Sequence, residues 1–352
     1  MAAFTVGILE ALAARPDLDV SAFALTWRGR GLLHEQLPAG VRGVARPMAA
    51  RPLRALWRRW DWPVVESWTG AVDVVHGTNF VVPPSRSAAR IVTVHDLTPE
   101  RHPELVHRAS LAFPELVRRA LARGAWVHTV SSFVAAEVVD RLGADPERVV
   151  TVAQGVPPVA PAPAGAGARL AGAGRYVLAL GTIEPRKDHP ALVRAFDAVA
   201  ATRPELRLVL AGPDGWGTDA LAAALDRARN RARIVRLGYV DGAERAALLR
   251  DASVFAYPSR YEGFGLPPLE AMAVGVPVVA TSAGSLPEVL GDAALFVRPG
   301  DDEALADALS RALDDDGLRA RLVAAGTGQA GRYSWERCGA GLADLYRRAV
   351  EE

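Results

Sequence analysis

Short apolar segments alternate with helical segments throughout the second half of the chain, and this alternation constrains the fold more than any other feature. Between two apolar segments, residues such as Leu192, Val193 and Phe196 recur at helical spacing. Continuously apolar strands that are each followed by a helix predict a parallel sheet with both faces covered, which is a doubly wound α/β domain. The expected strands are residues 176–181, 206–212, 234–238, 253–258, 276–281 and 294–297, and the expected helices include 189–203, 219–229 and 243–251.

The first half repeats this pattern less cleanly. Its expected strands are residues 19–26, 72–76, 89–95, 126–131 and 149–154, and its expected helices are 3–14, 53–68, 103–123 and 133–142. A segment of Pro, Ala and Gly at 157–174 is typical of a linker. We therefore expect an N-terminal Rossmann-like domain (1–156), a linker (157–174), a second Rossmann-like domain (175–334) and a helix (335–352) that packs back onto the first domain. Ligands of such sheets bind beyond the carboxyl ends of the strands, so a cleft between the domains is the expected site.

Charge and composition narrow the class of protein. The 352 residues carry a formal net charge of +1, which gives no indication of a nucleic-acid partner. A single cysteine excludes an internal disulfide and a cysteine-rich zinc site. No apolar segment reaches the roughly 18 residues of a membrane-spanning helix, and no signal peptide is evident. These features predict a cytoplasmic protein.

The densest group of chemically distinctive residues lies at 258–272, with the sequence PSRYEGFGLPPLEAM. A strand ends here, a glycine-rich loop follows, and two prolines open a helix. Backbone N–H groups at such a junction attract anions. Glu270, one turn into the helix, is placed to accept hydrogen bonds from a ribose diol, and Glu262 in the loop from sugar hydroxyls. The alternative is a tight turn with a solvated Glu262 and a helix-capping Glu270.

A second group follows the first strand of the same domain, where residues 181–187 read GTIEPRK. Arg186 and Lys187 stand at the start of a helix and suit a diphosphate leaving group, since Arg offers a planar fork and Lys a point charge. The alternative is a solvated loop in which the two cations pair with Glu184 or Asp188.

Three weaker candidates lie in the first half. His95 ends an expected strand and suits contact with a transferred sugar or an acceptor, although a buried structural histidine fits equally well. His76 ends the preceding strand and has a weaker claim. Asp17 and Asp19 have the spacing of a metal-binding DxD pair, but a turn between helix and strand is the favoured interpretation.

Residues 53–60 combine basic and aromatic side chains. A helix with this composition suits an anionic membrane face, which would serve a lipid-linked acceptor. An amphipathic helix that packs its tryptophans inward is the favoured alternative.

The motif at 262–270 resembles the E-x7-E signature of the family 4 retaining glycosyltransferases, which have the GT-B fold. The segment 181–187 is similar to the phosphate-binding segment of that family. Further similar segments are VHDLTP (94–99), VSSF (130–133), VPVVAT (276–281) and LPEVLGDAA (286–294). This ordered set covers nearly the whole chain and is far more specific than E-x7-E alone.

The resemblance implies transfer of a hexosyl group, with a leaning toward mannosyl, from a nucleotide-diphosphate sugar to a glycan or lipid-linked acceptor, with retention and without a metal or other cofactor. By position, Arg186 and Lys187 would hold the diphosphate and Glu270 the ribose. Glu262 would address the sugar, and His95 would stand at the reacting face. Further donor-binding backbone is implied for Gly263, Phe264, Gly265, Leu266, Tyr239 and Val240. The leaving diphosphate would itself take the acceptor's proton in a front-side displacement.

One departure from the family concerns the N-terminus. Family members open with a strand and a glycine-rich loop before the first helix, whereas residues 1–12 already have the pattern of that helix. We therefore expect the first strand of the N-terminal domain to be missing. This expectation motivates an alternative function, a catalytically impaired GT-B partner protein that binds nucleotide. Separately, the basic and aromatic residues 53–60 extend the localisation hypothesis to peripheral contact with the inner membrane face.

Overall fold

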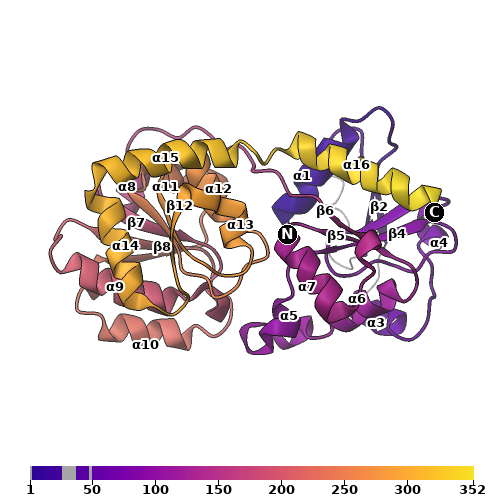
Figure 1. The fold of residues 1–352 in the computed structure, drawn as a ribbon, viewed down its shortest axis with the longest axis horizontal. Coiled ribbons are helices and arrows are strands. Elements are labelled where there is room, and N and C mark those ends of the chain that lie inside the picture. The colour runs from indigo at the N-terminus through magenta and orange to yellow at the C-terminus, as the bar shows by residue number, and fades with distance from the viewer. Residues whose placement is uncertain (1, 26–36, 47–49) are drawn as a thin grey trace. The chain divides into compact units, whose positions relative to one another are not determined.

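The structure is a computed structural model that describes residues 2–25, 37–46 and 50–352. Its contacts divide the chain into two compact units. Unit 1 comprises Met1–Arg101, Arg108–Pro157 and Tyr333–Glu352, and unit 2 comprises His102–His107 and Pro158–Arg332. The last helix therefore belongs to unit 1, although it follows unit 2 in the sequence (Figure 1).

Unit 2 contains a six-stranded parallel sheet. Its strands are β7 (Tyr176–Leu180), β8 (Arg207–Ala211), β9 (Ile234–Gly238), β10 (Val254–Tyr257), β11 (Val278–Thr281) and β12 (Ala294–Val297). Their order in the sheet is β12-β11-β10-β7-β8-β9. The chain builds outward from β7 to β9, returns to place β10 beside β7, and then builds outward in the other direction. The strands at 176–181, 206–212, 234–238, 253–258, 276–281 and 294–297 were all predicted, to within a few residues.

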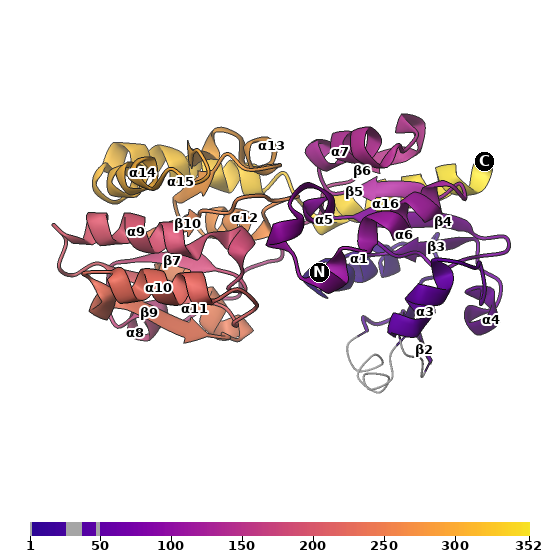
Figure 2. The ribbon, with the colours of Figure 1, turned by 90° about the horizontal axis from the view of Figure 1, so that it is seen from below.

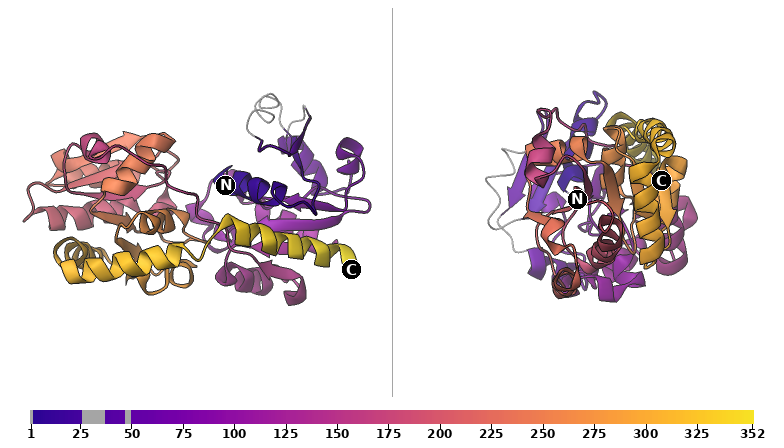
Figure 3. Two further views of the ribbon diagram at one scale, coloured as in Figure 1. Left: turned by 90° about the horizontal axis from the view of Figure 1, so that it is seen from above. Right: turned by 90° about the vertical axis from the view of Figure 1, so that its left-hand side faces the viewer.

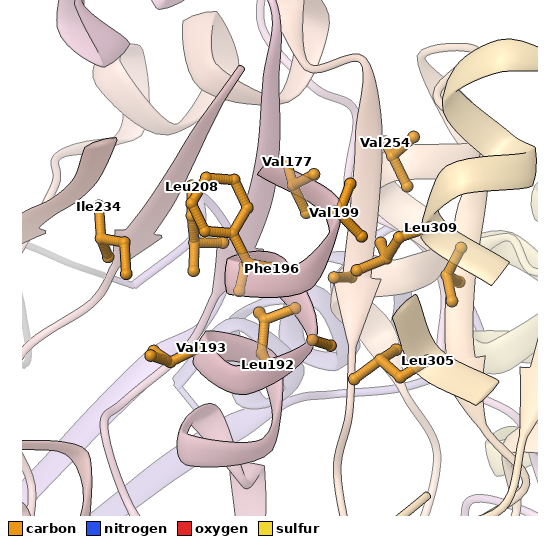
Figure 4. Close-up of a cluster of buried hydrophobic side chains, with 14 of the residues drawn as sticks. Val177, Leu192, Val193, Phe196, Val199, Leu208, Ile234, Val254, Leu305 and Leu309 are labelled. Atoms are coloured by element: carbon orange, nitrogen blue, oxygen red, sulfur yellow. The ribbon is translucent and has the colours of Figure 1, made fainter. Parts of the chain in front are cut away.

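Helices cover both faces of this sheet (Figures 1 and 2). One face carries α9 (His189–Ala200), α10 (Asp219–Arg227) and α14 (Asp302–Asp314), and the other carries α8 (Ala166–Ala171), α11 (Gly242–Asp251), α12 (Leu266–Ala273), α13 (Leu286–Leu290) and α15 (Asp316–Ala330). Phe196 and Leu192 of α9 pack with Val177 and Leu208 of the sheet and Leu309 of α14, all fully buried (Figure 4). This continuous apolar core explains why the strands lack polar alternation.

In unit 1, the described strands form a four-stranded parallel sheet and a separate parallel pair. The sheet has the order β3 (Val74–Gly77), β4 (Ala89–Val94), β5 (Trp126–Thr129) and β6 (Val149–Thr151), and the pair consists of β1 (Ser21–Leu25) and β2 (Arg42–Arg46). Val92 and Val94 of β4 point into a cluster with α6 (Phe113–Leu121) and α7 (Ser132–Leu142). The side chain between them, Thr93, points to the opposite face.

That opposite face is covered by α1 (Ala2–Ala13) and α16 (Trp335–Glu351), which lie side by side in Figures 1 and 3. Glycines allow this close packing: a Cβ on Gly7 would lie 2.4 Å from the Trp335 ring, and a Cβ on Gly339 would lie 2.9 Å from the Cβ of Ala11. The shorter helices are α3 (Ala50–Trp57), α4 (Glu66–Thr69), α5 (Thr98–Arg101) and the 3₁₀ turns Pro103–Leu105, Arg108–Ser110, Pro146–Arg148, Pro185–Lys187, Arg231–Arg233 and Gly291–Ala293.

Three predicted segments need correction. The helix expected over 53–68 ends at Trp57, and the helix expected over 103–123 is continuous only from Phe113 to Leu121. Prolines explain both breaks, because Pro63 and Pro114 lack the N–H that a helix interior requires. The segment 157–174 is not a linker throughout: Ala166–Ala171 form α8, which packs on α11 through Gly167 and Ala171.

A cavity of about 920 Å³ lies in unit 1, lined by residues of both β1 and β3. Ile8 and Leu12 of α1 and Phe23 of β1 contribute apolar side chains to its wall, as does Val74 of β3. Among the described strands, β1 pairs only with β2, and β3 only with β4. Continuous strand pairing across unit 1 is therefore interrupted at this cavity.

Candidate active site

The loops after β7 and β10 meet at the carboxyl edge of the unit 2 sheet. These strands are neighbours, and the chain leaves them toward opposite sides of the sheet, so they flank the topological switch point where ligands of such sheets bind. The backbone N–H of Arg260 donates to the carbonyl of Arg186 at 2.8 Å and joins the two loops. The two groups predicted from the sequence thus lie together.

Arg186 and Lys187 both pair with Glu262. The Arg186 Nη1 lies 2.7 Å from Glu262 Oε2, and the Lys187 Nζ lies 2.7 Å from Glu262 Oε1. Glu262 is 6% exposed. Although burial alone would raise its pKa, the two cations hold the pKa of Glu262 at about 2. The alternative of a solvated Glu262 is wrong, and this cluster is a preformed arrangement of alternating charges.

Of the two alternative partners predicted for the cations, Glu184 and Asp188, one pairs with them. Arg186 also pairs with Glu184 at 2.7 Å, whereas Asp188 pairs with Arg260 at 2.8 Å. Arg186 and Lys187 are mostly buried rather than solvated.

Lys187 is held on a second side by Tyr257, the last residue of β10. Its Nζ donates to the Tyr257 hydroxyl at 2.5 Å and lies 4.4 Å from the centre of the ring. Burial lowers the pKa of Lys187, with Glu262 opposing the shift. Lys187 is also the only lysine in the sequence. Sequence reasoning did not identify Tyr257, because its role depends on the adjacency of β7 and β10.

Glu270 lies on α12 and is 3% exposed. Both of its carboxylate oxygens accept from Arg245 of α11, with Nη1 to Oε1 at 2.6 Å and Nη2 to Oε2 as the second contact. Burial raises the pKa of Glu270, and Arg245 opposes this shift. Glu270 does not cap its helix, so that alternative is wrong. Arg245 was missed because nothing in the sequence links it to a residue 25 positions away.

The loop between the two glutamates is tightly packed. Gly263, Phe264 and Gly265 are buried, and Gly265 adopts φ 97° directly before Leu266, the first residue of α12. The next loop of the sheet closes against it: a Cβ on Gly284 would lie 2.2 Å from the Glu262 carbonyl oxygen. Glycine is therefore required at this approach.

Tyr239 and Val240 lie in the loop between β9 and α11, at the same carboxyl edge. Tyr239 is 76% exposed, and Gly238 before it has φ 70°. The neighbouring loop at 212–217 packs against 181–185: a Cβ on Gly212 would lie 2.0 Å from the Gly181 carbonyl oxygen.

His95 lies in unit 1, directly after β4. Its Nε2–H donates to the carbonyl of Thr78 at 2.9 Å, and its ring packs edge-on against Phe4 with centroids 4.8 Å apart. Burial lowers the pKa of His95. The imidazole is therefore neutral near pH 7, and Nδ1 is its hydrogen-bond acceptor.

His76 has a structural environment. A hydrogen-bonded chain runs from Tyr346 through His76 and Thr93 to His128 and the carbonyl of Val152, with successive distances of 2.7, 2.7, 2.9 and 2.9 Å. Because the carbonyl can only accept, every donor in the chain is determined, starting from the Tyr346 hydroxyl. This chain ties α16 to three strands of the sheet.

Asp17 lies in the turn between α1 and β1, as favoured, and pairs with Arg15 and with Arg347 at 2.6 Å. The predicted basic and aromatic helix is also present in part. Trp57 is buried, whereas Trp60 lies beyond the helix end and is 57% exposed, so only one of the two tryptophans packs inward.

Comparison with known proteins places this chain in a family. A model described as "Glycosyltransferase Family 4" matches residues 1–159, and one described as "Glycosyl transferases group 1" matches residues 168–329. An O-antigen chain mannosyltransferase B of Escherichia coli is 36% identical over 286 residues, which cover 78% of this chain and 74% of that protein. The chain belongs to glycosyltransferase family 4.

Other relatives of this glycosyltransferase differ in what they act on. A D-inositol 3-phosphate glycosyltransferase of Nocardioides is 35% identical over 239 residues, which cover 62% of this chain and 52% of that protein. Among solved structures, an Anabaena protein, HepE, in complex with UDP and glucose has a TM-score of 0.73 at 17% identity, covering 98% of this chain and 95% of that one. The two units are the Rossmann-like domains of the GT-B fold.

Two absences concern residues 2–25, 37–46 and 50–352, the part of the glycosyltransferase that the structure describes. That part of the chain contains no group of three or more His, Cys, Asp or Glu placed to hold a metal ion. It also contains no helix that is both long and apolar enough to span a bilayer.

Proposed function

We propose that this glycosyltransferase transfers a hexosyl group, specifically mannosyl, from a nucleotide-diphosphate sugar to a glycan or lipid-linked acceptor, with retention of anomeric configuration. The observation that carries the proposal is the buried cluster of Arg186, Lys187 and Glu262 at the switch point of unit 2. Two convergent cations, both held by Glu262, suit a diphosphate whose charge grows as it departs.

Each residue of the site has a proposed task. Arg186 and Lys187 stabilise the leaving diphosphate, while Glu262 fixes both cations and accepts from the sugar. Glu270 accepts from the ribose, and the backbone of 263–266 and 239–240 lies along the phosphates and the base. The departing diphosphate takes the proton of the acceptor hydroxyl on the same face of the sugar, so no covalent intermediate and no metal are part of the proposal.

The relatives support the choice of sugar and donor. The Escherichia coli relative carries the word mannosyltransferase in its name, and the Anabaena structure contains UDP and glucose. The first favours mannose as the transferred sugar, and the second favours a nucleotide as the carrier.

A donor panel tests the proposal. GDP-, UDP-, ADP- and dTDP-sugars are first compared by thermal shift, because a ligand that binds the folded state raises the melting temperature. The donor that stabilises the enzyme is then incubated with mannosyl acceptors, and the anomeric configuration of the product is read by NMR. A product with the opposite configuration to the donor would overturn retention, and the absence of stabilisation by any member would overturn the donor class.

Two substitutions test the site. Lys187→Ala and Glu270→Ala should each lower kcat/KM for the donor by well over about tenfold, since each removes a charged contact. Arg194→Ala is the control, because Arg194 pairs with Asp302 between α9 and α14, away from the switch point. Near-normal activity of both site variants would refute the assignment.

The role of His95 is part of the same proposal. Its neutral Nδ1 accepts a hydrogen bond from a hydroxyl group of either the transferred sugar or the acceptor substrate. His95→Ala should then lower kcat, whereas His95→Gln, which retains an acceptor, should lose less. Equal losses would count against a hydrogen-bonding role.

We further propose that the enzyme contacts an anionic membrane surface and binds a lipid-linked acceptor there. Trp60 and Trp62 are 57% and 66% exposed, and the exposed Arg58 and Arg59 adjoin them. Exposed tryptophans beside arginines suit the interface of a bilayer. Cosedimentation with anionic but not zwitterionic vesicles, lost in a Trp60→Ala, Trp62→Ala double variant, would support this contact, and indifference to vesicle charge would exclude it.

A further inference from the structure

The cavity in unit 1 borders one edge of β1, and the pairing of β1 with β2 shows which backbone groups lie there. In a parallel strand, the N–H and C=O of one residue point to the same side, and those of the next residue point to the opposite side. Arg42 of β2 donates its N–H to the carbonyl of Val20 at 3.2 Å, so Val20 and every second residue after it face β2. The backbone N–H and C=O of Ser21 and Phe23 therefore face away from β2, and both residues line the cavity.

β3 presents the opposite edge of the cavity. Ala89 of β4 donates its N–H to the carbonyl of Asp73 at 2.8 Å, so Asp73 and every second residue after it face β4. The backbone N–H and C=O of Val74 and His76 therefore face away from β4, and both residues line the cavity. Among the described strands, β1 and β3 have no partner on these two sides.

The helices on this face show that β1 and β3 run in the same direction. α1 starts at the carboxyl edge of the sheet, where the Phe4 ring lies 4.8 Å from the ring of His95, just after β4. After α1, Asp17 pairs with Arg347 of α16 at 2.6 Å. The guanidinium of the next residue of α16 lies 5.0 Å from the ring of Trp126, the first residue of β5. β1 therefore starts at the amino edge of the sheet, as β3 does.

Apolar side chains cover the cavity on both faces. Ile8 and Leu12 of α1 line it on the face that α1 and α16 cover. Trp57 and Val65 line it from the other face, where Trp57 also meets Leu116 of α6. All of these side chains are buried. A strand that is enclosed on both faces in this way is continuously apolar, as β7 is in unit 2.

The two ends of the cavity differ in polarity. Asp19 and Asp73, both exposed, precede β1 and β3 and line the amino end, where Arg42 offsets only part of their charge. This charge favours a cation at the amino end of a bound segment. At the carboxyl end, Asn79 lines the cavity, and its Oδ1 is buried without a hydrogen-bond partner among the described residues. A buried acceptor of this kind requires a donor, such as the backbone N–H of a segment that emerges beside β3.

We propose that this cavity is a strand-binding slot for one extended peptide segment, which residues 2–25, 37–46 and 50–352 do not supply. The segment runs parallel to β1 and β3, with a basic residue at its amino end and then an apolar run about as long as β3, which has 4 residues. Its backbone pairs with Ser21 and Phe23 on one side and with Val74 and His76 on the other. The pair β1-β2 and the sheet β3-β4-β5-β6 then become one continuous parallel sheet.

Two strands of this chain provide peptide probes of the required chemistry. Residues 175–181 (RYVLALG) contain β7, and residues 90–95 (RIVTVH) contain most of β4. Each of these strands lies between two parallel neighbours, and each peptide begins with arginine. In excess over the full chain, at least one of them should raise the melting temperature by at least about 4 °C, because a ligand of the folded state stabilises it.

Amide hydrogen exchange, measured residue by residue by NMR, locates the bound peptide. Exchange should slow by at least about tenfold at the four amides that face the slot, since each gains a hydrogen bond. The amides of Ala22 and Val75, which already face β2 and β4, are the internal control and should change much less. The four slot amides are those of Ser21, Phe23, Val74 and His76.

Proline provides the matched controls, because it cannot donate to a strand partner. A peptide of residues 175–181 that carries Val177→Pro and Ala179→Pro should protect none of the four amides. In the protein, Val74→Pro removes one donor that faces the slot and should weaken peptide binding at least about tenfold. Val74 is the first residue of β3, where proline is tolerated, and Ser21→Pro at the start of β1 is the second variant if Val74→Pro does not fold.

The outcomes separate the possible occupants. If neither peptide protects the four amides, the slot hypothesis is overturned. Equal binding of the proline peptide would identify a plain apolar pocket instead, and protection that appears without peptide as the chain dimerises would identify a second copy as the occupant. Nucleotide binding by unit 2 does not enter these measurements, so their result is independent of the proposed function.

Discussion

At the scale of single residues, Lys187 is the most informative position. Apart from Lys187, all Lys and Arg residues of the sequence are arginines. Lys187 itself is buried between Glu262 and Tyr257. An ammonium group is a compact point charge with three donors, whereas a guanidinium is a wide planar fork. The space between a carboxylate and a phenol therefore favours lysine against the general composition of the chain.

We predict that Lys187→Arg, although it conserves the charge, lowers kcat/KM for the donor by at least about tenfold, because the larger group displaces Glu262 or Tyr257. Steady-state kinetics with the stabilising donor provide the measurement, and a melting curve shows whether the variant is folded. An arginine variant with wild-type kinetics would mean that only charge matters at this position.

The sequence predicted the cations and carboxylates of this site but not their pairing. Arg186, Lys187, Glu262 and Glu270 are each recognisable from local motifs. Arg245 and Tyr257 are not, because each becomes relevant only through a neighbouring strand or helix that the local sequence does not specify. The burial of Glu262 was missed for the same reason, since three separate loops enclose it.

At the scale of elements, the contact between α1 and α16 depends on small residues. A Cβ on Gly339 would lie 2.9 Å from the Cβ of Ala11 and 3.1 Å from its carbonyl oxygen. Since the obstacle includes helix backbone, it cannot move without shifting α1.

Gly339→Ala should therefore destabilise unit 1 by about 1–3 kcal/mol from overpacking, against a gain of about 1 kcal/mol from helix propensity. Gly328→Ala in α15 is the matched control: nothing lies within 4 Å of its added Cβ, so it should be neutral or stabilising by about 0.5–1 kcal/mol. Urea denaturation compares the two. A stabilised Gly339→Ala variant would show that α1 and α16 can separate without cost.

The histidine chain beneath α16 gives unit 1 a dependence on pH. Burial lowers the pKa of His128 to about 4 and that of His76 well below its usual 6.5. The unfolded chain thus binds protons between about pH 6.5 and 4 that the folded chain does not, so stability is lost as the pH falls through this window. His128 alone accounts for roughly 3 kcal/mol.

Urea midpoints at pH 7.5, 6.0 and 5.0 provide the measurement, and we expect a steady decline. The stability that Glu262 contributes through its pKa near 2 is lost mainly as the pH falls below its unfolded value of 4.5, so it has little effect between pH 7.5 and 5.0. A midpoint that stays constant from pH 7.5 to 5.0 would contradict a neutral, buried His128.

Element types were predictable where the apolar pattern is strong. The strands of unit 2 are buried on both faces, and their uninterrupted apolar segments indicate this directly. The helix expected over 103–123 failed because apolar periodicity continues through Pro114, which breaks the backbone hydrogen bonding that periodicity assumes. The helix α8 was missed because Ala and Gly form a helix here only when α11 covers them.

At the scale of the whole molecule, unit 1 is assembled from distant parts of the chain. Trp335 packs on Gly7 and Gly155, and Tyr346 donates to His76. Unit 2 takes almost all of its residues from the single segment Pro158–Arg332. The sequence predicted residues 335–352 as a helix apart from the second domain, one that packs back onto the first domain.

Removal of residues 333–352 should consequently unfold unit 1 and spare unit 2. In limited proteolysis, we expect cleavage throughout the first 157 residues and a protected fragment from the second half that still binds nucleotide. Uniform digestion of the truncated chain would show that unit 2 also needs the final helix.

The discontinuity of unit 1 also has a consequence during synthesis. A growing chain emerges from its N-terminus, and a domain folds once all of its residues are available. The domain that is begun first here lacks α16 until Trp335–Glu351 have been made, whereas the second domain is complete once Arg332 has been added. The usual order of folding on the ribosome is therefore reversed, and until α16 has been made the nascent first half exposes the apolar face that this helix will cover.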